Sequence, residues 1–140
     1  MDKARRDALL ARIGDVNEKT EDLPLVTLEE FFIGNDDGAS IWCNLESGPP
    51  PDKVYEILKG IRDRPNVADV RVMVMQFDGG EDDWPFSDTV YFITSRSEAD
   101  VLSWLGAAHA PDEIETAASF GRAERVPLPD GMHVISAWWD

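Results

Sequence analysis

The sequence predicts an α+β domain with a ferredoxin-like β-α-β-β-α-β order, preceded by an N-terminal helical extension. Three observations predict it: apolar stretches typical of strands, amphipathic helical patterns between them, and Pro- or Gly-containing breaks at the junctions. The length of 140 residues and the 43% hydrophobic content suit one domain. We therefore expect a single domain over 1–140, with the extension over 1–35 and an α+β sandwich over 40–140.

The extension is expected to contain two helices. The first covers 2–19, where apolar residues recur at helical spacing. Its stripe consists of Leu9, Leu10, Ile13 and Val16. The second begins at Thr27, a suitable N-cap, because Glu30 follows three positions later as a capping box requires. Gly34 and the polar residues after it end that helix.

Four strands and two helices are expected after residue 40. Pro65 ends the first of these helices, and an acidic, Gly-rich turn separates the two central strands. Both helices would cover one face of an antiparallel sheet, because each β-α-β half makes a right-handed crossover. The expected order is strand 40–45, helix 52–64, strand 69–77, strand 88–94, helix 97–108 and strand 132–139.

Both faces of this sheet are predicted to be apolar. A strand with one wet face alternates apolar and polar residues, whereas 70–77 and 89–94 are apolar at nearly every position. Two helices cover one face, so something else must cover the other. We favour the extension 1–35 as this cover, with a second copy of the chain as the alternative. The protein is accordingly expected to be a monomer or a homodimer.

The charge balance restricts the class of partner. Lys and Arg total 13 against 28 Asp and Glu, so the net charge is −15. This opposes binding to nucleic-acid phosphates and to anionic membranes, since both attract cationic side chains. It suits a basic protein partner, although solubility alone also explains it.

The compartment predicted from the sequence is the cytoplasm. A single cysteine, Cys43, allows no internal disulfide, which fits a reducing environment. The N-terminus lacks the apolar region of a secretory signal, and no apolar run is long enough to span a bilayer.

The segment after the strand 69–77 is the strongest candidate for a binding surface. Its carboxylates precede an aromatic Trp-Pro-Phe stretch, a combination typical of an interface anchor with an electrostatic rim. The alternative is a solvated turn followed by a loop plug that seals the edge of the core. The candidate partner-binding residues are Asp78, Glu81, Asp82, Asp83, Trp84 and Phe86.

Catalytic signals are weak. Cys43 and His133 form the one nucleophile-and-base pair worth testing, because the first and last strands of a ferredoxin-like sheet are neighbours. A buried, inert thiol is the more ordinary reading of Cys43. No phosphate-binding loop, zinc-ligand spacing or nucleophile elbow occurs, and the acidic turn does not match a calcium loop. We expect no catalytic residues, no metal and no cofactor.

Several stretches resemble a group of small uncharacterised bacterial proteins. They are Leu25–Phe32, the Gly-Asn-Asp-Asp turn at 34–37, Trp84–Tyr91 and the ending Trp138–Asp140. Those proteins are similar in size and charge to immunity proteins of bacterial toxin systems. The resemblance covers about a third of the chain and implies a toxin-neutralising, protein-binding role. It includes no catalytic motif, so no site residues are carried over.

The expected function is therefore that of a non-enzymatic protein-binding module with an acidic surface facing a basic partner, and its narrower form is an immunity-type inhibitor. One alternative is a small-molecule enzyme or ligand sensor that uses the open sheet face. Another is a structural subunit of a larger assembly.

Overall fold

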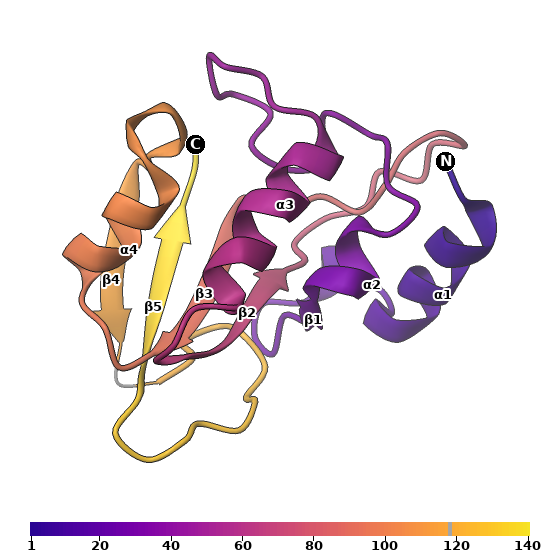
Figure 1. Ribbon diagram of the computed structural model, residues 1–140. Helices are drawn as coiled ribbons and strands as arrows, with labels where there is room; N and C mark the ends of the chain where they lie inside the picture. Colours follow the sequence, from indigo (N-terminus) through magenta and orange to yellow (C-terminus); the bar gives the residue numbers. More distant parts are fainter. Residues whose placement is uncertain (118) are drawn as a thin grey trace.

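The computed structural model describes residues 1–117 and 119–140 and confirms the mixed α+β class (Figure 1). One antiparallel sheet has the strand order β1-β2-β3-β5-β4. The strands are β1 (Leu25–Thr27), β2 (Val67–Met73), β3 (Thr89–Thr94), β4 (Glu113–Ala117) and β5 (His133–Trp138). The α-helices are α1 (Lys3–Ile13), α2 (Leu28–Phe32), α3 (Pro51–Arg62) and α4 (Glu98–Leu105), with short 3-10 turns at Val16–Glu18 and Ala107–His109.

The expected strand at 40–45 does not form. These residues make consecutive turns, and Trp42 has a φ of 52°, a left-handed conformation that a strand cannot contain. One edge of the sheet is formed by β1, which lies within the stretch that we assigned to the N-terminal extension. Leu25 pairs with Met73 and Thr27 with Arg71. Three residues are too few for a period of two to be visible, so β1 was missed.

The second missed strand is β4, which lies between the expected helix 97–108 and the expected strand 132–139, where we predict no regular element. Among the described residues, its one neighbour in the sheet is β5. Strands β3 and β4 run in the same direction with β5 between them, so β3-α4-β4 is a split β-α-β unit. The other half of the ferredoxin-like order is absent, because β1 and β2 are direct antiparallel neighbours.

All four helices contribute to one core on one face of the sheet, the helix side (Figure 1). Val70 and Val72 of β2 and Phe92 of β3 are fully buried beneath Val54 and Leu58 of α3. Helix α1 adds Leu9 and Ile13 to this same core. The N-terminal helix is therefore not the cover of the opposite face, and that expectation was wrong.

The opposite face, which we call the second face, is partly covered by residues 119–132, the covering segment. Phe120 and Ala123 are buried there against Tyr91, Ile93 and other apolar residues of the strands. The Phe120 ring stacks on Tyr91 with 6.4 Å between ring centroids, and Tyr91 Oη donates to the Phe120 carbonyl at 3.2 Å. The prediction that both faces are apolar holds over this half of the sheet, but the cover comes from the loop between β4 and β5. The N-terminal stretch contributes Leu23 and Leu25 to this apolar cluster on the second face.

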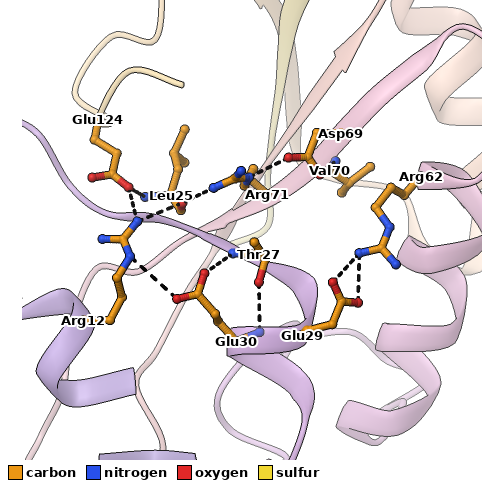
Figure 2. A network of polar contacts seen from close by, with 10 residues as sticks. All are labelled: Arg12, Leu25, Thr27, Glu29, Glu30, Arg62, Asp69, Val70, Arg71 and Glu124. Atoms are coloured by element: carbon orange, nitrogen blue, oxygen red, sulfur yellow. Dashed lines mark hydrogen bonds and ion pairs between the residues drawn. The ribbon is translucent and has the colours of Figure 1, made fainter. Parts of the chain in front are cut away.

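A polar network at the β1 edge joins the two sides of the sheet (Figure 2). The predicted capping box is present: Thr27 Oγ1 accepts from Glu30 N at 3.1 Å, and Glu30 Oε1 accepts from Thr27 N at 3.0 Å. Arg12 of α1 contacts Glu30 at 3.6 Å and Glu124 of the covering segment at 2.5 Å. Helix, edge strand and covering segment are thereby held together.

Within the described residues, no helix is long and apolar enough to cross a membrane.

Candidate functional site

Two acidic turns that lie about 40 residues apart in the sequence meet on one surface. The first turn holds Asp36 and Asp37, and the second is the candidate segment identified above. Their direct link is a hydrogen bond of 3.0 Å from the backbone N–H of Trp84 to Asp37 Oδ2. We call the combined surface the acidic face. Its carboxylates are Asp36, Asp37, Asp78, Glu81, Asp82 and Asp83.

The first turn is built by side chains that bond to nearby backbone groups. Asn35 Oδ1 accepts from the N–H of Asp37, and Asp37 Oδ1 accepts from the N–H of Ala39, both at 2.9 Å. Asn35 is itself buried and donates to Ser40 Oγ at 2.9 Å. Such Asx turns need no ligand to form, because the Asn and Asp side chains supply acceptors for the backbone N–H groups two residues on. They hold Asp37 in one position.

The second turn is held from outside by α1. The Arg6 guanidinium donates from Nη1 to the carbonyls of Gly80, Glu81 and Asp83 at 3.0, 2.7 and 3.2 Å. Within the turn, Asp83 Oδ2 accepts from the N–H of Gly80 at 3.0 Å. Nη1 of Arg6 thus donates to backbone carbonyl oxygens of this turn. Glu81 and Asp82 are exposed to solvent.

The start of α1 is anchored to both turns. The N-terminal ammonium contacts Asp36 Oδ2 at 2.8 Å, and the pKa of the Asp36 carboxyl is lowered mainly by this hydrogen bond. Lys3 approaches Glu81 at 3.7 Å. The cations at 3–6 oppose the helix dipole, but they lie against acidic turns that attract them. Asp2 also caps the helix by accepting from the N–H of Arg5.

A pocket of about 290 Å³ lies between the turns. It is lined by Asp37, Ala39, Gln76, Asp78, Asp83, Trp84 and Phe86. Phe86 is half-buried, whereas Trp84 is only 2% exposed and belongs to the helix-side core. Trp84 thus packs as a wall of the pocket, and Phe86 is the aromatic residue that a partner can reach. Carboxylates beside an accessible aromatic ring are suited to receiving a cationic group.

The structure groups the six candidate residues unevenly. Asp78, Asp83, Trp84 and Phe86 line the pocket, while Glu81 and Asp82 lie outside its lining and are exposed. Asp37 was not among the candidates. No spacing in the sequence connects it to the second turn, because only the fold brings residues 37 and 83 together.

Cys43 and His133 do not come together. Cys43 is exposed and lines a small pocket with Trp139 and Asp140, beyond the end of β5. His133 begins β5, so the length of that strand, about 17 Å, separates the two regions. His133 Nε2 instead contacts the Arg96 carbonyl at 2.7 Å. The pair depended on a strand at 40–45, which does not form.

Residues 4–137 match the family described as "Uncharacterized protein YfbO family". The chain belongs to the YfbO family. The matched range includes both acidic turns and the covering segment. A relative from Escherichia coli strain K12, described as "Uncharacterized protein YfbO", is 41% identical over 128 residues, which cover 91% of this chain and 90% of the relative. No solved structure matches the chain.

Among the described residues of this family member, no group of three or more His, Cys, Asp or Glu side chains is arranged to hold a metal ion.

Proposed function

We propose that this protein is a non-enzymatic binding module whose acidic face engages a basic protein partner. The narrower form of the proposal is an immunity-type inhibitor, in which the basic partner is a toxin. The observation that supports the proposal is the convergence of the two acidic turns around a pocket with aromatic lining residues.

The rigidity of the acidic face favours binding. The Asp37 and Asp83 carboxylates each accept backbone hydrogen bonds, and Arg6 holds the second turn through three carbonyl oxygens. A preorganised surface loses little conformational entropy on association. An Arg or Lys side chain of the partner would enter the pocket, meet Asp78 and Phe86, and be surrounded by the exposed carboxylates.

The net charge of −15 acts at longer range. It attracts a cationic partner over about one Debye length, which is roughly 8 Å at physiological ionic strength. Association should therefore be fast at low salt and slower as salt is added. Residence time should depend on the pocket contacts, because short-range contacts govern dissociation.

The test compares two triple variants as baits in the host lysate. The first removes charge from the acidic face: Asp78→Asn, Glu81→Gln and Asp82→Asn. The control removes the same number of charges from exposed positions elsewhere: Asp15→Asn, Glu21→Gln and Glu46→Gln. Captured proteins are identified by mass spectrometry, and the binding of each purified candidate is then measured at several salt concentrations.

We expect wild type and control to retain a basic partner in a salt-sensitive way and the acidic-face variant to lose it by at least about tenfold in Kd. Equal losses in both variants would show that only the overall charge matters. Capture of partners that are neither basic nor salt-sensitive would also contradict the proposal. For the narrower form, the purified partner must be toxic when expressed alone and harmless when co-expressed with wild type.

A further inference from the structure

The second face carries a pocket that is separate from the acidic face. The covering segment shields only part of this face, and the remaining part forms an open pocket of about 330 Å³. Its floor consists of side chains that alternate toward the second face on four neighbouring strands. Met73, Thr89 and Trp138 form one cross-strand row with Glu113, while Tyr91 and Ser136 form the next row with Glu115.

The far end of the pocket is formed by Gly121 and Arg122 of the covering segment. Arg122 Nε donates to the Thr20 carbonyl at 3.2 Å, which fixes the base of the guanidinium. Tyr91 is held by its hydrogen bond to the Phe120 carbonyl, and the Trp138 indole donates to Asp88 Oδ2 at 3.0 Å. The aromatic groups of the floor are therefore anchored before any ligand arrives.

The charges around this pocket are opposite in sign but unpaired. Glu113 and Glu115 lie on β4, and Arg122 lies on the covering segment. Within residues 1–117 and 119–140, none of these three has an ion-pair partner within 4.0 Å. Arg12, Arg62 and Arg71, in contrast, each contact a carboxylate at 2.7 Å or closer. Positive and negative groups thus border one pocket with a gap between them.

We propose that this pocket binds a small zwitterion of the α-amino acid class. The ligand carboxylate is received by the Arg122 guanidinium, whose planar donors match a carboxylate. The ligand ammonium is received by Glu113 and Glu115 on the opposite side. The ligand side chain lies over Met73, Tyr91 and Trp138, so apolar amino acids fit best. The volume lies near the lower end of the range of about 300–1,000 Å³ for small-molecule pockets.

A zwitterion explains the pocket better than a simple ion does. A simple anion would be repelled by two carboxylates, and a simple cation would be repelled by Arg122. A ligand that carries both charges gains from both sides of the gap. This inference does not depend on the acidic face, which is built from different residues.

The test is calorimetric titration of the purified full chain with leucine, methionine and phenylalanine. We expect saturable binding with a Kd below about 1 mM for at least one of them. The corresponding N-acetyl amino acid, which lacks the ammonium, and the amino-acid amide, which lacks the carboxylate, should each bind at least about tenfold more weakly.

The protein variants test the same assignment. Arg122→Gln and Glu115→Gln should each weaken binding of the free amino acid by about tenfold or more. Arg125→Gln is the matched control, because Arg125 is exposed on the same segment but does not line the pocket. Circular dichroism must show native folding for each variant, and Glu115→Gln, on an exposed edge-strand position, provides the test if Arg122→Gln does not fold.

Absence of saturable binding by all three amino acids would overturn the proposal. So would equal binding of the blocked analogues, or unchanged binding by both pocket variants.

Discussion

Arg12 Nη2 donates to Glu124 Oε1 at 2.5 Å, and the same carboxylate oxygen accepts the backbone N–H of Leu25 at 3.0 Å. Arg12 belongs to α1 on the helix side, whereas Glu124 belongs to the segment that covers the second face (Figure 2). Two residues 112 positions apart in the sequence thus contact each other at the β1 edge of the sheet.

Glu124→Ala should destabilise the protein by about 1–3 kcal/mol, because the buried N–H of Leu25 loses its acceptor. Glu124→Gln keeps an oxygen that can accept the Leu25 N–H, so it should lower the free energy of unfolding by less. The loss of the ion pair with Arg12 should add little, because both side chains are partly exposed. Urea unfolding followed by tryptophan fluorescence measures both values. Glu46→Ala, at an exposed position, is the control. Equal effects of Ala and Gln would argue that the charge matters more than the backbone hydrogen bond.

Gly34→Ala should be destabilising by about 1–3 kcal/mol. Gly34 has a φ of +87°, and an added Cβ would lie 2.7 Å from Asp2 Cβ. The substitution should therefore also separate the start of α1 from the acidic face. Gly38→Ala, in the same turn, is the matched control because no heavy atom of the described residues outside its immediate chain neighbours lies within 4 Å of its added Cβ. Thermal unfolding of the two variants should differ clearly, and similar melting temperatures would contradict the close approach of Asp2.

Phe120→Ala should cost about 3–5 kcal/mol, the usual range for removing a buried phenylalanine ring. It should also increase binding of a hydrophobic dye, since Tyr91 and Ile93 lose their cover. Leu128→Ala, in the same covering segment but 40% exposed, should change neither quantity appreciably. If Phe120→Ala left both stability and dye binding unchanged, the covering segment would not shield the second face in solution.

Acid stability should depend on Glu29. Its carboxylate accepts from Arg62 Nη1 at 2.7 and 2.9 Å and from the Tyr55 hydroxyl at 2.7 Å. The hydrogen bond from Arg62 is the largest cause of a pKa below the ordinary value of 4.5. The unfolded chain therefore binds a proton more readily than the folded protein does. The contribution is complete above pH 4.5 and is lost as the pH falls below it through the folded pKa.

Glu29→Gln should accordingly lower stability at neutral pH and flatten the loss of stability in acid. The Glu29 side chain is 41% exposed, so we expect about 0.2–1 kcal/mol at most from the ion pair. Unfolding free energies of wild type and variant, measured at pH values on both sides of 4.5, test this. Curves that stay parallel throughout the acidic range would show that Glu29 is not the linked group.

Elements with a strong local signal were predictable from the sequence. The capping box at Thr27 and Glu30 depends on residues three positions apart, and both of its hydrogen bonds are present. Helix α3 follows from its apolar stripe and from Pro65 beyond its end. The strongly apolar strands β2, β3 and β5 were expected near their observed positions, although β2 ends at Met73 rather than at 77.

Elements that form because of contacts with distant parts of the chain were not predictable from the sequence. Strand β1 has three residues and exists because β2 offers an edge, and β4 alternates too weakly to be seen without β5. The expected strand at 40–45 has suitable residues, but Trp42 turns back to pack on Trp139 with 4.8 Å between ring centroids. Tertiary contacts outweighed local propensity at these positions.

Composition and short-range periodicity were enough to predict the α+β class, the strong negative charge and a second apolar sheet face, which the structure shows over one half of the sheet. The tertiary structure alone decided which segment covers the second face and that Asp37 joins Asp78 and Asp83 around one pocket. Both results depend on contacts between side chains that are far apart in the sequence. A local sequence pattern does not predict which distant residue a side chain will contact.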